Sequence, residues 1–113
     1  MNWNVAGALL MAAAVALGAF GAHGLRARLD AYSMGVYEKA VFYHFIHALG
    51  ILLASRIPLV CWLLLAGIAF FSGSLYLLAV TGNRMLGAIT PIGGVCFIAA
   101  WIVFAFRSWG SKI

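Results

Sequence analysis

Charge is what this sequence has least of. Seven Lys and Arg and two Asp and Glu make up 8% of 113 residues, whereas a soluble domain carries about 25% charged residues. Apolar residues reach 66%, and the mean hydropathy is +1.11. The chain cannot cover itself with polar side chains, so its composition excludes a soluble enzyme and a disordered chain.

Because charges are so few, long stretches of the chain have none. Cutting the sequence at every charged residue leaves four such stretches, 1–25, 40–55, 57–83 and 85–106. A helix that crosses the hydrocarbon core needs about 20 residues, so three stretches are long enough and the second nearly is. The sequence therefore predicts an all-α, multi-pass membrane protein, with the lipid bilayer as its main partner.

Acidic residues are scarcer than basic ones, which gives a net charge of +5. A nucleic-acid partner would require the basic side chains to form a patch. They flank the apolar stretches instead, at Arg26, Arg28, Lys39, Arg56, Arg84, Arg107 and Lys112. This placement is typical of helix ends anchored at lipid head groups, and it predicts no nucleic-acid partner.

The first uncharged stretch lacks the basic segment that begins a secretory signal, so we interpret it as a retained membrane helix. Within it, Ala14, Gly18 and Ala22 recur at four-residue spacing. Small residues at that spacing let helices approach closely in lipid. The face is expected to pack either inside the chain's own bundle or against a second copy in a homo-oligomer.

The connection after this helix shows a helical pattern of its own. Leu25, Leu29 and Tyr32 recur at helical spacing, while Arg26 and Asp30 form an i,i+4 pair on another face. The pattern predicts a short interfacial helix that lies along the membrane surface between the first two spans.

The second span must extend beyond its uncharged part, to about 35–55, with Ser33 as its cap. This requires Glu38 and Lys39 to lie near the head groups. Lys39 precedes His47 by eight residues, about 12 Å along a helix axis. His44 and His47 are therefore predicted near the middle of the membrane.

The last two spans are predicted at about 58–80 and 86–107, with Pro58 in a first helical turn. Pro91 indicates either a kinked fourth helix, which we favour, or a helix that begins there with Thr90 as its cap. Short connections predict a four-helix antiparallel bundle, residues 1–113 forming one domain with helices at about 3–24, 35–55, 58–80 and 86–107. Small residues are expected to allow close packing at Gly73, Gly93 and Gly94.

Basic residues are divided almost evenly between the two sides of this bundle. The side with both termini and the turn at Arg56 carries three, and the other side carries four. By the positive-inside rule, this difference predicts both termini outside the cytoplasm.

Four motifs occur in order along the chain: residues 18–25 (GAFGAHGL), Tyr43-His44 with 47–50 (HALG), 71–76 (FSGSLY) and 90–94 (TPIGG). Together they resemble the domain of unknown function 423 family of small membrane proteins, which is similar to the animal transmembrane protein 256. The resemblance covers nearly the whole chain. It implies a four-helix inner-membrane protein, and it implies no reaction and no catalytic residue.

Candidate functional side chains are the polar ones inside the spans. Ionisable groups at membrane depth are costly and usually face the bundle interior. The candidate cluster comprises His23, His44, His47, Ser72, Ser74, Tyr76 and Thr90. We expect hydrogen bonds from the two mid-span histidines to hydroxyls on neighbouring helices.

Cofactor chemistry requires further ligands. A metal site would need His23 or a carboxylate beside the histidine pair, and a haem would need a ligand on the opposite face. The sequence therefore predicts no metal, no cofactor and no catalytic residue.

Two functional hypotheses follow. The first is a non-enzymatic, compact, self-associating four-helix bundle. The alternative is a small transporter or channel for protons, a metal ion or a small solute that uses His44 and His47. An enzyme of lipid metabolism is a third and weaker interpretation. A polar cavity beside His44 would favour transport, and a tightly packed interior would favour the bundle.

Overall fold

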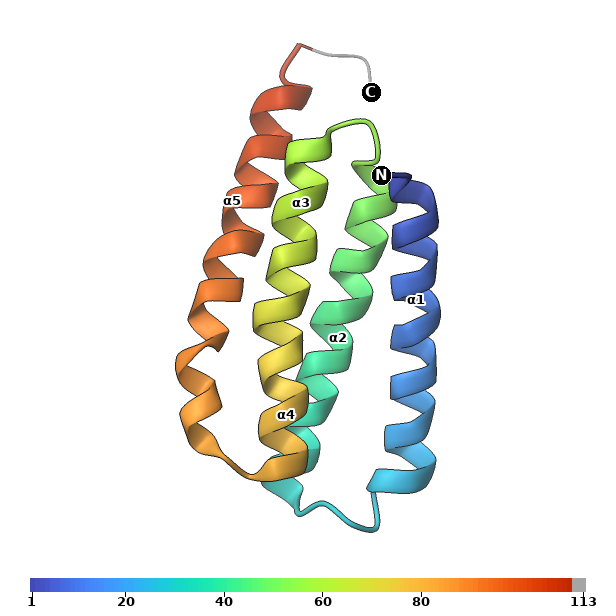
Figure 1. The fold of residues 1–113 in the computed structure, drawn as a ribbon, viewed down its shortest axis with the longest axis vertical. Helices are drawn as coiled ribbons and strands as arrows, with labels where there is room; N and C mark the ends of the chain where they lie inside the picture. The colour runs from blue at the N-terminus through green and yellow to red at the C-terminus, as the bar shows by residue number, and fades with distance from the viewer. Residues whose placement is uncertain (111–113) are drawn as a thin grey trace.

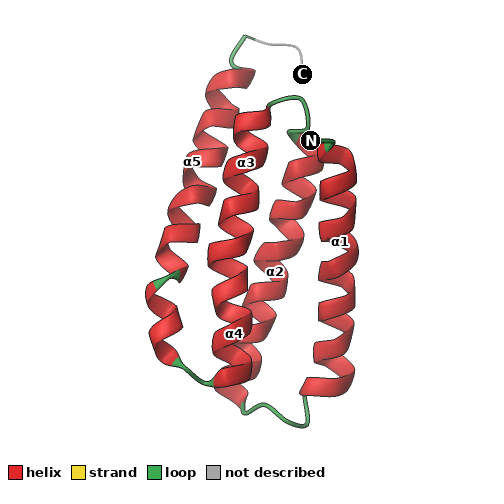
Figure 2. Ribbon diagram, in the orientation of Figure 1, coloured by secondary structure: helices red, strands yellow, loops and turns green. Residues whose placement is uncertain are grey.

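The computed structural model describes residues 1–110, which form helices joined by short turns (Figure 2). Lys112, counted above among the basic residues, lies outside this range. The predicted all-α architecture is confirmed.

The first two helices begin at side-chain caps. Asn2 accepts hydrogen bonds from the backbone N–H groups of Asn4 and Val5 at 3.1 and 3.2 Å, and α1 (Trp3–Phe20) follows. A π-helical turn, η1 (Gly21–Leu25), extends it. Asp30 caps α2 (Ala31–Leu53) by accepting from the Ser33 N–H at 2.7 Å. The predicted cap, Ser33, is thus the donor in this contact.

The separate interfacial helix between the first two spans does not form, so that prediction is wrong. Residues 21–25 continue α1, and 31–34 already belong to α2, which begins about four residues earlier than predicted. Asp30 in extended backbone starts α2 at that point, because its carboxylate satisfies an otherwise unpaired N–H in the first turn. The expected Arg26–Asp30 pair is also wrong, since Arg26 pairs with Glu38.

The third span is one long helix with a π-helical segment in its middle. It consists of α3 (Pro58–Gly67), η2 (Ile68–Ser72) and α4 (Gly73–Thr81). Pro58 lies in the first turn, as predicted. Gly82 ends the helix with φ of +73°, a left-handed conformation that glycine adopts without a steric penalty.

The fourth helix differs from the kinked version we favoured. A 3₁₀ segment, η3 (Arg84–Ala88), precedes α5 (Thr90–Ser108), which carries Pro91 in its first turn. A proline there leaves no intrahelical donor unpaired, so the helix starts at this point instead of bending through it. Thr90 does not act as a cap, because no side chain caps α5.

The helices run alternately up and down the long axis of the molecule (Figure 1). α2 lies at the centre with the third span, α1 packs on α2 along one flank, and α5 packs on α3 and η2 along the other. The start of α1 and the end of α5 lie at the same end of the bundle. The antiparallel four-helix bundle is thus confirmed.

Within the part of the chain that the structure describes, length and composition identify three candidate membrane spans: Trp3–Leu25, Pro58–Thr81 and Arg84–Ser108. The fourth long helix, α2, has 23 residues, enough for about 35 Å at 1.5 Å per residue. It is more polar because it carries Glu38, Lys39 and two histidines. These polar groups lie on the helix that has neighbours on both flanks.

The core lies along α2 and the third span. Its larger part draws on four helices and contains Trp3, Ala48, Ile51, Ala54, Ile57, Val60, Cys61, Leu64, Ile68, Phe97 and Ala100. A smaller cluster near the η1 end contains Leu25, Met34, Tyr37 and Ala79. The two mid-span histidines lie between these two clusters along α2.

Candidate functional site

His44 lies in the middle of α2 and is 4% exposed. Its Nδ1 atom shares a hydrogen bond with the Tyr76 hydroxyl on α4 at 2.8 Å, and the rings meet edge to face. This confirms the expectation that a mid-span histidine bonds to a hydroxyl on a neighbouring helix. The other ring nitrogen, Nε2, is buried without a hydrogen-bond partner among the described residues.

His47, 5% exposed, is held differently. Its Nδ1 lies 2.7 Å from the Tyr43 carbonyl one turn earlier, and since a carbonyl can only accept, Nδ1 carries the proton. The imidazole stacks on Phe97 of α5 with ring centroids 3.5 Å apart, and Trp101 lies 5.8 Å away. His47 is therefore fixed by its own helix and by aromatic rings, and not by the hydroxyls we predicted.

The predicted hydroxyl residues form two further contacts across the bundle. Ser72 in η2 donates to the Ala40 carbonyl of α2 at 2.9 Å. Ser74 lies 2.6 Å from the Thr90 hydroxyl at the start of α5 and donates to the Phe71 carbonyl at 3.0 Å. Such interhelical bonds fix neighbouring helices in lipid.

One contributor, Tyr37, was missed from the sequence. Its hydroxyl donates to the Leu17 carbonyl of α1, and its ring packs edge to face on Tyr76, with centroids 5.4 Å apart. The signal was available, since Tyr37 precedes His44 by two helical turns and so shares its face. The polar contacts thus run from α1 through α2 to α4.

His23 lies apart from this cluster, exposed in η1. Within residues 1–110, no three His, Cys, Asp or Glu side chains come close enough to hold a metal ion. The other candidate residues form separate contacts between helices: His44 with Tyr76, Ser72 with the Ala40 carbonyl, and Ser74 with Thr90. His47 is held apart from these hydroxyls.

The glycines predicted to allow close packing differ in how closely their neighbours approach. A Cβ built at Gly93 would overlap the Phe71 backbone, whereas at Gly94 it would meet only the Phe71 ring, at 3.9 Å. Gly73 has an open surrounding, with the nearest atom at 3.8 Å. Gly93 is therefore the position where α5 and η2 approach most closely.

On α1, Ala14 is fully buried, Gly18 faces Val41 of α2, and Ala22 is exposed. The four-residue stripe therefore packs inside the bundle over its first two members, the first of the two alternatives left open by the sequence.

Two of the surface hollows among residues 1–110 have no histidine in their lining. One, of about 560 Å³, is lined by the residues Ile46, Leu49, Gly50, Leu52, Leu53 and Trp101. The other, of about 280 Å³, lies between α1 and α2, with Arg26 and Glu38 among its lining residues. These two side chains form an ion pair at 3.5 Å. We call this hollow the α1–α2 groove.

The comparisons with known proteins agree with this architecture. Residues 17–94 match the model of a family described as "Protein of unknown function (DUF423)". The chain is 48% identical to a UPF0382 membrane protein of Staphylococcus haemolyticus over 93% of both chains. It is 50% identical to one of Staphylococcus saprophyticus, over 93% and 94%, and 44% identical to one of Bacillus subtilis, over 88% and 89%. No solved structure matches the chain.

Proposed function

We propose, from the premise that this chain belongs to the DUF423 family of proteins of unknown function, that it is a non-enzymatic membrane protein that acts through helix association within the bilayer. Its helices form a closed, side-chain-filled bundle instead of a conduit. The outer face of α1 carries the association.

The observation that carries this proposal is the occupation of the space around both mid-span histidines. Tyr76 engages Nδ1 of His44, and Phe97 lies flat on His47 with 3.5 Å between ring centroids. Side chains of the protein itself therefore fill the positions that a solute or a water file would take. Close packing of this kind supports a structural role for the two rings.

Self-association has support in the surface of α1. Ala8, Ala12 and Ala16 recur at four-residue spacing and are all exposed. The helix that carries them, α1, packs mainly against α2 through its other side. Alanines at this spacing let two helices approach closely in lipid. This stripe is a different face from the one predicted above, which packs on α2 within the chain.

Crosslinking in native membranes tests this association. Ala12→Leu adds bulk on the exposed stripe and should lower the dimer yield severalfold without changing the melting temperature of the monomer. Ala105→Leu, at an exposed alanine of α5, is the matched control and should leave the yield unchanged. Equal yields for wild type and Ala12→Leu would refute the α1 interface.

A proton path is the second candidate, and one observation favours it. Nε2 of His44 is buried and makes no hydrogen bond among the described residues, so no partner group holds its lone pair or proton. A histidine can titrate near neutral pH, which a glutamine cannot.

Proton flux into reconstituted vesicles distinguishes the two candidates. Under the structural proposal, vesicles that contain wild type or His44→Gln take up protons no faster than empty vesicles at any pH between 5 and 8. A pH-dependent flux that is lost in a fully folded His44→Gln variant would overturn the proposal in favour of the proton path.

A further inference from the structure

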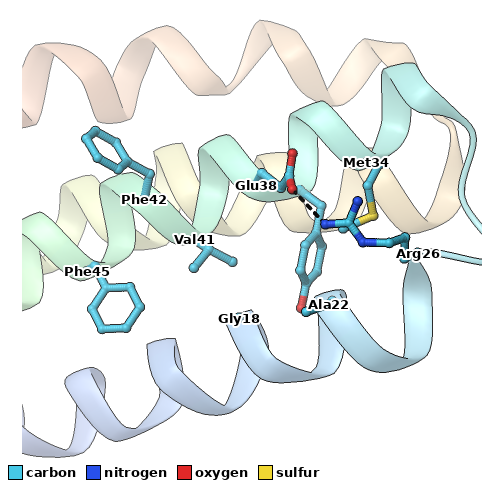
Figure 3. A pocket seen from close by; sticks show the side chains of 10 residues that line it. Gly18, Ala22, Arg26, Met34, Glu38, Val41, Phe42 and Phe45 are labelled. Carbon is cyan, nitrogen blue, oxygen red and sulfur yellow. Dashed lines mark hydrogen bonds and ion pairs between the residues drawn. The ribbon is translucent and has the colours of Figure 1, made fainter.

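The α1–α2 groove has two unlike walls (Figure 3). On the α1 side, Gly18, Gly21 and Ala22 present almost no side chain. On the α2 side, the wall is apolar and mostly bulky, formed by Met34, Tyr37, Val41, Phe42 and Phe45. The groove is therefore a slot between the two helices with an apolar interior.

Glycine lets α1 and α2 pack closely along the wall of this slot. A Cβ at Gly21 would overlap the Tyr37 ring, and one at Gly18 would lie 3.4 Å from Val41 Cγ1. Larger side chains at these two positions would fill the groove or force the helices apart. The volume of about 280 Å³ is also too small for a second helix, since 10 Å of helix with side chains occupies roughly 800 Å³.

One end of the groove is charged. Arg26 and Glu38 face each other there (Figure 3), 3.5 Å apart, with 65% and 58% of their side chains exposed. Among the described residues this is the one hydrogen bond that the Arg26 guanidinium makes, although that group has five N–H donors. The pair is thus long and open to outside groups.

The surroundings of this end are positive. The turn after η1, the first turns of α2 and the start of η3 place four basic residues against two acidic ones at this end, Arg26, Arg28, Lys39 and Arg84 against Asp30 and Glu38. Arg84 lies over the Tyr32 ring, 4.3 Å from its centroid, which brings η3 to the start of α2. An excess of positive charge at a membrane surface attracts anionic lipid.

We propose that the α1–α2 groove binds phosphatidylglycerol, with the phosphodiester on Arg26 and the upper part of one acyl chain in the slot. The distance from Glu38 to Phe45 along α2 is about 10 Å at 1.5 Å per residue, so the chain descends from the interface toward the membrane centre. Glu38 accepts hydrogen bonds from the glycerol hydroxyls of the head group, and Arg26 donates to the phosphate in a charge-assisted geometry.

This arrangement predicts an order of binding affinities among three phospholipids. Phosphatidylcholine carries no hydrogen-bond donor for Glu38, and its head group has no net charge. Phosphatidylethanolamine has donors, but it is also neutral and gains less from the surplus positive charge. Phosphatidylglycerol alone among the three matches the apolar slot, the carboxylate and the positive field together.

Lipid titration followed by native mass spectrometry tests the site on the full-length protein. The wild type should retain phosphatidylglycerol more tightly than phosphatidylcholine, with phosphatidylethanolamine between them. Arg26→Gln should weaken phosphatidylglycerol binding about fivefold, the value that corresponds to the loss of one basic residue at a membrane surface. Arg107→Gln, at an exposed arginine near the end of α5, is the matched control and should leave binding unchanged.

A second variant tests the slot separately from the charge. Gly18→Leu should reduce binding of every diacyl lipid, while Arg26→Gln should affect the anionic one most. Because Gly18→Leu could disturb folding, its melting temperature is measured in parallel and the Arg26 result stands independently.

Three results would overturn the proposal: equal retention of phosphatidylglycerol and phosphatidylcholine by the wild type, equal behaviour of Arg26→Gln and Arg107→Gln, or displacement of the lipid by millimolar inorganic phosphate. A contact between two copies of the chain mapped to Phe42 in the groove would also overturn it, because the second copy would then be the occupant.

Discussion

Polar side chains in two stretches of α2 differ in their burial and in the length of their hydrogen bonds. In the middle of the helix, His44 is 4% exposed and bonded to Tyr76 at 2.8 Å. Six residues earlier, Glu38 is 58% exposed and meets Arg26 at 3.5 Å. The interior pair is short and enclosed by protein, whereas the groove pair is long and open to the head groups.

The difference follows from the surroundings of each stretch. In hydrocarbon an unpaired polar group has no water to bond with, so a partner within the chain stabilises an interior group, as Tyr76 does for Nδ1 of His44. Near the interface, water and head groups can satisfy the same groups, so a loose ion pair is tolerated. The buried His44–Tyr76 bond therefore indicates a structural role. The loose Arg26–Glu38 pair leaves hydrogen-bonding groups free for a ligand.

The largest expected effect lies in the interior. Gly93→Ala should destabilise the bundle by roughly 1–3 kcal/mol or more, because the added Cβ would overlap the Phe71 backbone and overpacking of this kind forces backbone shifts. Gly94→Ala, where the Cβ meets only the Phe71 ring at 3.9 Å, is the control and should be nearly neutral. Thermal unfolding in detergent measures both, and similar losses at the two positions would contradict this account of the α5–η2 contact.

Next in size is the His44–Tyr76 hydrogen bond. His44→Leu should cost about 0.6 to 2 kcal/mol, since it leaves the Tyr76 hydroxyl without this partner in lipid. His44→Gln should cost less, because glutamine keeps a donor and an acceptor at similar length. A double-mutant cycle with Tyr76→Phe measures the coupling directly, and a coupling of zero would mean that the bond seen at 2.8 Å adds nothing to stability.

The groove pair should matter much less for folding. Arg26→Gln is expected to change the free energy of unfolding by less than about 0.5 kcal/mol, because exposed ion pairs contribute little. The measurement is again thermal unfolding, now at low and at high salt. A loss as large as that of His44→Leu would remove the contrast between the two regions.

The smallest effect concerns the cap of α2 and depends on pH. The hydrogen bond from the Ser33 backbone N–H lowers the pKa of Asp30 below its ordinary value of 3.8. A carboxylate with a lowered pKa stabilises the fold above its ordinary pKa, and this contribution is lost as the pH falls through the lowered value. The stability difference between wild type and Asp30→Asn should therefore be present at pH 7 and shrink as the pH falls below the ordinary pKa of 3.8. A difference that stays constant over this range would show that the charge of Asp30 does not contribute.

Some parts of the site could be predicted because they depend on local patterns. His44 and His47 at i,i+3 had to share one face of a helix, and their cost in lipid required interior partners. The choice of Tyr76 for His44, and of the Tyr43 carbonyl for His47, depends on how α2 packs against α4 and α5. The Arg26–Glu38 pair was missed because it joins residues from two helices across a turn whose path the pattern of Leu25, Leu29 and Tyr32 did not reveal.

Helix number, antiparallel order and membrane location were readable from the chain, because apolar length and charge scarcity act residue by residue and need no knowledge of neighbours. The start of α2 at Asp30, the start of α5 at Thr90 and the inward turn of Ala14 and Gly18 came only from the folded structure. Caps, proline positions and small residues are each compatible with several boundaries or faces. Packing between helices selects one of them, because it determines which backbone groups are already paired and which surfaces must touch.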